Sequence, residues 1–165
     1  MKRRTLLCTP FLLAAPLVAG DYDALARTLR QAWPQCGTVA LVCDTAGSKG
    51  VIEAITGAMA GMKVIVMDVK GQQDIGKAVA TLTGRHPDAV VLVAGDKVAG
   101  DGSSAAAFLI QRLGAAKIPT VGTTEQAVKQ GAVFAVGPGT GGKVLGNAKA
   151  AGVAGVSLPA GALSN

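Results

Sequence analysis

The sequence predicts an α/β fold, a three-layer sandwich with a parallel sheet between two layers of helices. Short apolar runs, such as residues 38–43 (TVALVC) and 89–93 (AVVLV), alternate with longer segments whose apolar residues recur at helical spacing. Strands that are apolar throughout are expected where helices cover both faces of a sheet. Helices inserted between successive strands make the sheet parallel, with right-handed crossovers. We therefore predict a flavodoxin-like sheet of five or six strands, the sixth near Val156.

The first half of the chain supplies three of these strands. A leading amphipathic helix, residues 24–33, is ended by Pro34, because proline cannot continue a helix. The next predicted helix, residues 48–62, has a broad apolar face formed by Val51, Ile52, Ile55, Met59 and Met62. The other elements expected in this half are strands at 38–43, 64–67 and 89–93 and a helix at 74–83.

The second half continues the alternation. After a strand at 118–121, the spacing of Thr123 and Gln126 is that of a capping box at a helix start. Gly131 ends that helix, and a strand over 132–136 follows. Helices are also expected at 103–113 and 142–151. The predicted organisation is a leading helix and turn at 21–37, a single α/β lobe at 38–160 and a tail at 161–165.

Residues 1–20 have the layout of a secretory signal peptide. A basic start, residues 2–4, precedes a mostly apolar segment, residues 6–18, and small residues. Because this segment is shorter than the roughly 20 residues that span a bilayer, we expect cleavage after Ala19 or Gly20 and no stable membrane anchor afterwards. The two adjacent arginines also partly match a twin-arginine export signal. The expected location is periplasmic.

Charge and cysteines narrow the functional classes. The chain carries 16 Lys and Arg against 10 Asp and Glu, and three of the basic residues lie in the predicted signal peptide. The rest are scattered singly and 3% of the residues are aromatic, so we expect no nucleic-acid partner. Cys36 and Cys43 lie near opposite ends of a strand, about 23 Å apart if extended, too far for a disulfide. A buried apolar role is favoured for Cys43 over a metal or redox role.

Four segments together resemble a known family. From about residue 25 to 159 the sequence is similar to the carboxy-terminal lobe of ABC transporter substrate-binding proteins of the type I periplasmic-binding fold, the subfamily linked to tryptophan or tyrosine uptake. The resemblance implies two lobes that close over a small ligand, with the amino-terminal lobe expected to be absent here. The segments are LRQAWPQCGTVALVCDTAGSKG, DIGKAVATLTGRHPDAVVLVAGDKV, KIPTVGTTEQAVKQGAVFAVG and GKVLGNAKAAG.

The loops at the carboxyl ends of the strands form the predicted ligand-binding edge, because open α/β sheets bind ligands there, near the switch point of strand order. Small hydroxyls, charges and backbone N–H groups can orient a polar ligand. Each residue could instead cap a helix or form a turn, and a helix cap is the favoured role for Thr123 and Ser103. The candidate ligand-binding residues are Asp44, Thr45, Ser48, Asp96, Lys97, Thr123, Thr124 and Thr140.

The family pattern is not matched everywhere along this edge. Lys97 and Thr124 stand where the family has an amide and an acid, and Gly-Thr-Gly at 139–141 replaces its tyrosine pair. These differences argue against an amino-acid ligand.

Residues 137–144 (GPGTGGKV) nearly match a phosphate-binding P-loop. Val144 stands in place of the magnesium-binding hydroxyl residue, and the loop follows the fifth strand, so simple anion binding is the most we expect. His86, the only histidine, lies at the amino end of a strand, away from the predicted edge. Around the switch point the sequence offers no Ser/His/Asp set, paired carboxylates or metal-ligand spacing. We therefore predict no catalytic residue, cofactor or metal.

Two functions remain. The first is a non-catalytic solute-binding or sensing protein that binds a small polar or anionic ligand at the strand ends. It would serve an ABC transporter permease or a periplasmic receptor, and a homodimer could complete the site. The second is a single-lobe interaction module that docks on a periplasmic receptor, transporter or enzyme without its own ligand. The expected lack of a second lobe favours this alternative, since half a cleft buries too little of a ligand to bind it tightly.

Overall fold

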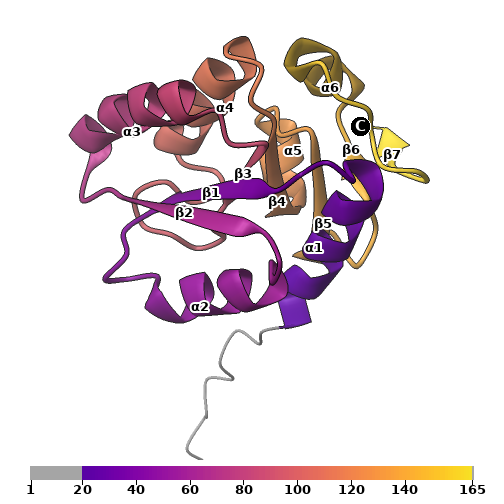
Figure 1. Cartoon of the computed structure of the whole chain (residues 1–165), viewed down its shortest axis with the longest axis horizontal. Coiled ribbons are helices and arrows are strands. Elements are labelled where there is room, and N and C mark those ends of the chain that lie inside the picture. Colours follow the sequence, from indigo (N-terminus) through magenta and orange to yellow (C-terminus); the bar gives the residue numbers. More distant parts are fainter. Residues whose placement is uncertain (1–19, 165) are drawn as a thin grey trace, which may run out of the picture.

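A sheet of seven strands forms the centre of the computed structural model, which describes residues 20–164 (Figure 1). The strand order is β2-β1-β3-β4-β5-β6-β7, and the first five strands run parallel. β6 is antiparallel to β5, and β7 is parallel to β6. This confirms the predicted α/β class and flavodoxin-like order. The strands are β1 (Thr38–Cys43), β2 (Lys63–Asp68), β3 (Ala89–Leu92), β4 (Thr120–Thr124), β5 (Phe134–Gly139), β6 (Leu145–Gly146) and β7 (Leu163–Ser164).

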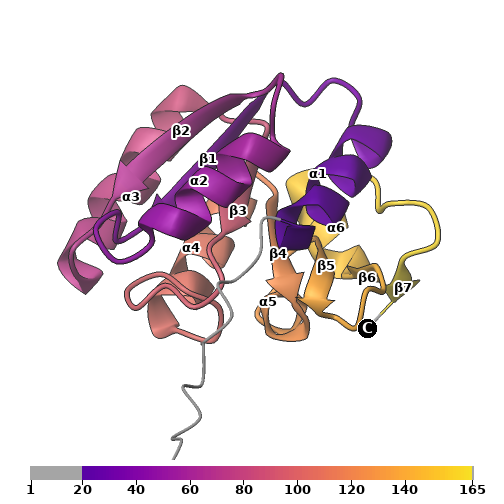
Figure 2. The ribbon, with the colours of Figure 1, turned by 90° about the horizontal axis from the view of Figure 1, so that it is seen from below.

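Helices cover both faces of this sheet. α1 (Gly20–Ala32) packs against α2 (Lys49–Ala58) on one face, and α3 (Gln72–Arg85) packs against α4 (Ser104–Ala115) on the other. Figures 1 and 2 show α2 and α3 on opposite sides of β1 and β2. The short helix α5 (Glu125–Lys129) connects β4 to β5, and α6 (Ala148–Ala154) contacts α4. The result is the predicted three-layer sandwich.

The apolar run in β1 is explained by burial on both faces. Val39, Leu41 and Cys43 pack in one core cluster, with residues of α1 and α2. Ala40 and Val42 point the other way and pack in a second cluster, with residues of α3 and α4. Because successive side chains of a strand alternate between faces, a strand covered on both sides is expected to be apolar at most of its positions. This is why TVALVC reads as one continuous apolar run.

The predicted helix over 142–151 is wrong in its first half. β6 occupies residues 145–146 and pairs with β5, and α6 begins only at Ala148. Gly141 and Gly142 have positive φ values of 61° and 75°, which a right-handed helix excludes. The sixth strand predicted near Val156 is also wrong, because residues 155–158 form no strand and β7 lies in the predicted tail.

The predicted capping box is wrong by one residue. Thr123 is the fourth residue of β4 and is buried, whereas Thr124 is the N-cap of α5 and accepts a hydrogen bond from the Ala127 N–H at 3.2 Å. The cap predicted at Ser103 is confirmed, since its hydroxyl oxygen accepts from the Ala106 N–H at 3.0 Å. Both caps lie at the carboxyl edge of the sheet, where they position the loops of the candidate site.

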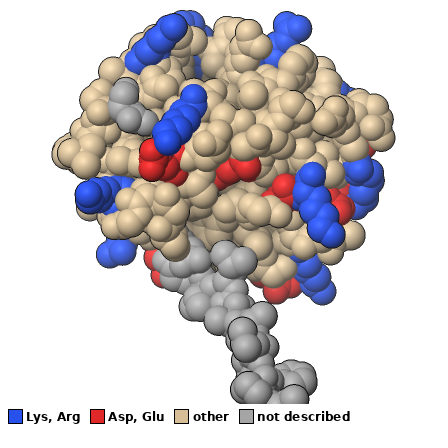
Figure 3. All heavy atoms as spheres, turned by 180° about the vertical axis from the view of Figure 1, so that it is seen from behind, with Lys and Arg blue, Asp and Glu red and all other residues tan. Residues whose placement is uncertain are grey.

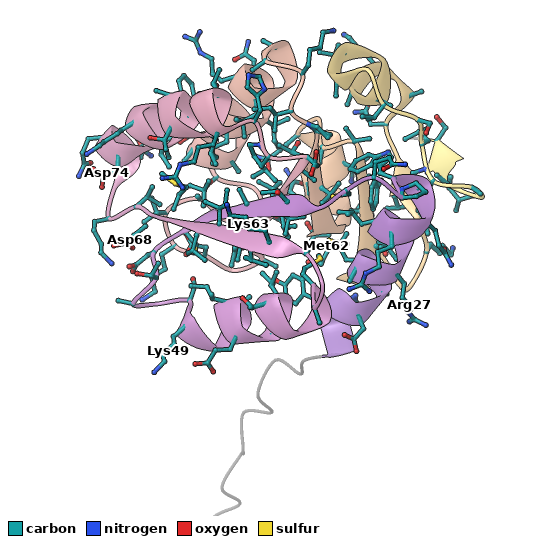
Figure 4. The ribbon with its side chains drawn as sticks, in the orientation of Figure 1. Arg27, Lys49, Met62, Lys63, Asp68 and Asp74 are labelled. Atoms are coloured by element: carbon teal, nitrogen blue, oxygen red, sulfur yellow. The ribbon has the colours of Figure 1, made fainter. Side chains whose placement is uncertain are left out.

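The predicted signal peptide falls almost wholly on residues 1–19, which lie outside the described residues. Within residues 20–164, none of the helices is long and apolar enough to cross a membrane. The face seen in Figure 3 carries its Lys and Arg side chains at scattered positions and not as one basic patch. Figure 4 shows Lys49, Lys63 and Arg27 similarly separated on the face that includes β2.

Candidate functional site

The carboxyl ends of β1 and β3 form the topological switch point of the sheet. These strands are neighbours, but the chain leaves β1 toward α2 on one face and leaves β3 toward α4 on the other. Ligands of open α/β sheets bind in the crevice that such diverging loops create. The structure brings three of the predicted residues together at this point, namely Asp44, Ser48 and Asp96.

Asp96 links the two loops of the switch point. Its Oδ2 accepts hydrogen bonds from the Asp44 N–H at 2.9 Å and the Ser48 hydroxyl at 2.6 Å. Its Oδ1 accepts from the N–H groups of Val98 at 2.9 Å and Ala99 at 2.8 Å. The residue is only 8% exposed, and four donors satisfy a carboxylate at that depth. Asp96 and Ser48 therefore hold the loops in place.

A charged cluster lies beside the switch point, at the ends of β1 and β2. Lys70 Nζ lies 2.8 Å from Asp44 Oδ1 and 3.0 Å from Asp68 Oδ1. Thr45 donates its N–H at 3.0 Å and its hydroxyl at 2.8 Å to the same Asp68 oxygen. Asp44 and Thr45 are thus joined through Asp68 and Lys70, and Figure 4 shows Asp68 at the end of β2.

Hydrogen bonds keep this cluster charged. The Thr45 N–H, then Lys70 and the Thr45 hydroxyl, lower the pKa of Asp68 to about 2. The hydrogen bond from Lys70 lowers the pKa of Asp44, and the bonds to Asp44 and Asp68 raise the pKa of Lys70. At neutral pH the three side chains therefore form an ion-paired cluster that already satisfies much of its own charge.

Asp101 lies in the loop between β3 and α4 and contacts Thr124 at the carboxyl end of β4. Unlike the carboxylates of the charged cluster, it has no cationic partner among the described residues. Its Oδ2 accepts the Thr124 hydroxyl at 2.5 Å, whereas Oδ1 is buried and has no hydrogen-bond partner among the described residues. Burial raises the pKa of Asp101, and the hydrogen bond from Thr124 opposes that shift only in part. A buried acceptor left without a partner typically costs about 1–3 kcal/mol. Asp101 therefore presents at this edge a buried carboxylate oxygen that no described residue satisfies.

The loop that carries Asp101 is held in a fixed position. Gln130 accepts the Gly102 N–H at 2.9 Å and donates to the Ser103 carbonyl oxygen at 3.0 Å. These bonds fasten the start of α4 to the end of α5. Together with the Thr124 hydroxyl, they fix the carboxylate between two helix starts without filling its second oxygen.

Three other predicted residues lie apart from Asp101 in their contacts. Thr123 is 4% exposed and lies within an irregularity of the β4–β5 pairing between Gly122 and Thr124, and the hydroxyl that reaches Asp101 is that of Thr124. The Thr140 hydroxyl accepts the Gly137 N–H at 3.1 Å, and its proton faces the carbonyl oxygens of Gly137 at 3.0 Å and Lys143 at 2.6 Å. Lys97 is exposed and makes no hydrogen bond or ion pair within residues 20–164.

The turn closed by Thr140 removes the structural context of a P-loop. It leads into β6 and not into a helix, so no helix N-terminus follows the GPGTGGKV segment directly. The turn still lies near the candidate site, because Gly139 pairs with Thr124 in the sheet.

Sequence reasoning missed Asp101. The sequence does contain a feature that could have identified it: an acidic residue between Gly100 and Gly102, two positions before the Ser103 cap. Its partner Thr124 was identified, although as a residue beyond the helix cap and not as the cap itself.

The described residues contain no group of His, Cys, Asp and Glu that could hold a metal ion. The thiols are also poorly suited to nucleophilic chemistry. Burial raises the pKa of Cys43 to about 12 and that of Cys36 to about 11, so both stay protonated at neutral pH. The side chains described at the carboxyl edge can form hydrogen bonds and ion pairs.

Comparisons with known proteins identify the architecture. No protein-family model matches the chain, and no curated protein sequence is significantly similar to it. A solved structure of a conserved domain protein from Vibrio cholerae matches with a TM-score of 0.72 at 18% identity, covering 86% of this chain and 59% of that one. The ABC domain from Streptococcus pneumonia in complex with L-Trp matches with a TM-score of 0.69 at 18% identity and the same coverages.

A third match is a substrate-binding protein with adhesive properties from Clostridium difficile, in a ligand-free, open structure. Its TM-score is 0.70 at 16% identity, with 84% of this chain and 57% of that chain covered. The chain therefore spans less than two thirds of the length of each of these proteins. Its fold is that of a single lobe of ABC transporter solute-binding proteins.

Proposed function

We propose that the protein is a non-catalytic solute-binding protein that takes a small polar ligand at the carboxyl edge of its sheet, around Asp101 and Thr124. The observation that carries this proposal is the buried Asp101 Oδ1, which has no hydrogen-bond partner among residues 20–164 and lies at the edge where α/β folds bind ligands. The fold shared with solute-binding proteins supports the same function.

The carboxylates of this edge favour a ligand that donates hydrogen bonds. A donor or cationic group placed at Asp101 Oδ1 would satisfy an acceptor that no described residue satisfies, and Thr124 already orients the carboxylate for it. Asp44, Asp68 and Asp96 lie at the same edge. An anionic ligand would be repelled by this negative charge. Of the polar and anionic ligands predicted from the sequence, we therefore propose a polar one.

A second surface would complete the site. One lobe alone forms half a cleft, which buries too little of a small ligand for tight binding. We propose that this surface is a second lobe or a second copy of the chain, and that an ABC transporter permease or a periplasmic receptor is the downstream partner. The periplasmic location rests on the predicted signal peptide. Lys97 and Thr123 stay candidate contacts of the completed site.

Thermal unfolding against a panel of amines, amino acids, sugars, carboxylates and phosphates tests the proposal. A ligand that prefers the folded state raises the melting temperature, by an amount that grows with the logarithm of its concentration relative to its Kd. We expect a rise for one donor-bearing class in the wild-type protein and none in the Asp101→Asn variant, with Asp23→Asn on α1 as the exposed control. A ligand that stabilises wild type and Asp101→Asn equally would contradict the assignment of the site.

A second function, a single-lobe interaction module without its own ligand, is favoured by one observation. Asp44, Thr45, Ser48 and Asp96 all direct their polar groups to one another or to neighbouring side chains. Such internal pairing would also suit a rigid docking surface. If the protein is monomeric and no ligand of the panel raises its melting temperature, this alternative is favoured over solute binding.

A further inference from the structure

A groove of about 420 Å³ lies between α4, α5 and α6, at the opposite edge of the sheet from Asp101. Thr120 and Val133, which line it, stand at the amino ends of β4 and β5. Small-molecule sites usually enclose about 300–1,000 Å³. The groove is therefore large enough for a ligand of its own, separate from the edge described above.

The walls of the groove are apolar. Ile110 and Ile118 are almost fully buried, while Val153 on α6 is 45% exposed and lies against Gly114 of α4. Ala150 completes the α6 wall. Val153 on one wall and the isoleucines on the other would both contact the apolar part of a ligand that lies in the groove.

A threonine lies at the base. Thr120 is 3% exposed and lines the groove, and no hydrogen bond joins its hydroxyl to another side chain or backbone group of residues 20–164. Because Val121 packs in the cluster with α1, strand alternation turns Thr120 toward α4 and the groove. The neighbouring amides are already engaged, since Gln130 bonds to the loop at 102–103 and Asn147 caps α6. Thr120 is thus the polar group of the base that a ligand would meet.

The polar rim of the groove is basic. Lys129 and Lys149 line it, and no Asp or Glu does. Lys129 Nζ lies 2.6 Å from Glu125 Oε1. Both side chains are exposed, and exposed ion pairs contribute little to stability. Lys149 is exposed and pairs with no acidic side chain among residues 20–164. An anionic group is the complementary partner for two lysines on one rim.

We infer that this groove binds an amphipathic carboxylate. The aliphatic body lies against Ile118 and Val153, the carboxylate lies at Lys129 and Lys149, and a terminal hydroxyl reaches Thr120. The three features come from different elements but face one groove, which is what distinguishes this region from a scattered apolar surface. The binding does not depend on the carboxyl-edge site. Gln130 lines the groove and also holds the loop at 102–103, but none of the contacts proposed for the carboxylate is a residue of that site.

Two-dimensional NMR titration of the full chain with 8-hydroxyoctanoate, octanoate and 8-amino-1-octanol tests this inference. We expect amide shifts at Gly131, Ala150 and Val153, with affinity falling from 8-hydroxyoctanoate to octanoate and no binding of the amine. Lys149→Glu should weaken 8-hydroxyoctanoate about two- to fivefold. Thr120→Val should weaken it about two- to tenfold and make it equal to octanoate.

Lys77→Glu on α3 is the matched charge control and should leave the affinity unchanged. If Thr120→Val fails to fold, the exposed Lys149→Glu variant still decides the question. Absence of groove shifts with 8-hydroxyoctanoate would overturn the inference. Equal binding of 8-amino-1-octanol, or equal effects of Lys149→Glu and Lys77→Glu, would overturn it as well.

Discussion

Asp96 and Asp101 are two carboxylates of one loop, five positions apart, with opposite surroundings. Asp96 accepts four hydrogen bonds, two from the loop after β1 and two from its own loop. Asp101 accepts one, from Thr124, and its other oxygen is buried without a partner among the described residues. At this edge, a carboxylate saturated with hydrogen-bond donors has a structural role, and a carboxylate with an unsatisfied oxygen is a candidate for ligand binding.

The backbone between the two aspartates explains how they separate. A Cβ on Gly100 would lie 2.2 Å from the Asp96 carbonyl oxygen, so only glycine fits where the loop folds back on Asp96. Gly102 then adopts a φ of +87° before the Ser103 cap. The first bend closes the donors around Asp96, and the second turns Asp101 away from them toward Thr124.

Asp96→Ala should have the largest effect on stability. Removing the carboxylate leaves four donors without their acceptor, and hydrogen bonds to charged groups are worth more than neutral ones. We expect a loss of about 3 kcal/mol, which lowers the melting temperature by about 6–12 °C in a domain of this size. Thermal unfolding followed by circular dichroism measures it. Equal losses of stability for Asp96→Ala and Asp101→Ala would show that the four hydrogen bonds of Asp96 do not distinguish it from Asp101.

Thr124→Val should have the next largest effect. The substitution removes the N-cap of α5 and the hydrogen-bond partner of Asp101 Oδ2, at a cost of about 1–2 kcal/mol. Ser103→Ala, which removes the α4 cap alone, is the matched control and should cost about 1 kcal/mol. Denaturant unfolding of both variants gives the difference. A smaller loss for Thr124→Val than for Ser103→Ala would mean that the bond to Asp101 adds nothing.

Asp101→Asn should stabilise the ligand-free protein at neutral pH, by about 1 kcal/mol, because it replaces a buried, half-satisfied charge with a neutral group. The pKa of Asp101 is raised on folding, so its ionisation opposes folding. Its favourable contribution is present below the ordinary carboxyl pKa and is lost as the pH rises through the raised value. The gain from Asp101→Asn should therefore grow over that same pH range. Unfolding curves from pH 4 to 8 measure it, and a pH-independent gain would contradict the cause.

Lys70→Gln should have the smallest effect, because the ion pairs with Asp44 and Asp68 are exposed. The pKa of Asp68 is lowered from 3.8 to about 2, so its stabilising contribution is present above pH 3.8 and is lost as the pH falls toward 2. Wild type should exceed Lys70→Gln slightly in melting temperature at pH 6 and match it near pH 2. A difference that persists at pH 2 would point to packing of the lysine stem.

Much of the fold followed from local patterns in the sequence. The β1 run was readable because both faces of that strand are covered, and the Ser103 cap because its serine directly precedes a helical pattern. The start of α6 was not readable. Residues 145–146 form a strand only through pairing with β5, a tertiary contact that leaves no periodicity in so short a segment.

The candidate site divides in the same way. Its location at the carboxyl edge followed from the parallel topology alone. The states of its side chains did not, because the donors that saturate Asp96 include Ser48, 48 positions earlier, and the bond that orients Asp101 comes from Thr124, 23 positions later. Contacts over such separations depend on the assembled sheet.

The most direct test of solute binding at Asp101 is an NMR titration with the ligand class that raises the melting temperature. We expect shifts of the Gly102, Ser103 and Thr124 amides in the wild-type protein and their loss in Asp101→Asn, with the fold of that variant intact. Shifts that map elsewhere, or that persist unchanged in Asp101→Asn, would contradict the assignment of this carboxylate as the ligand-binding group.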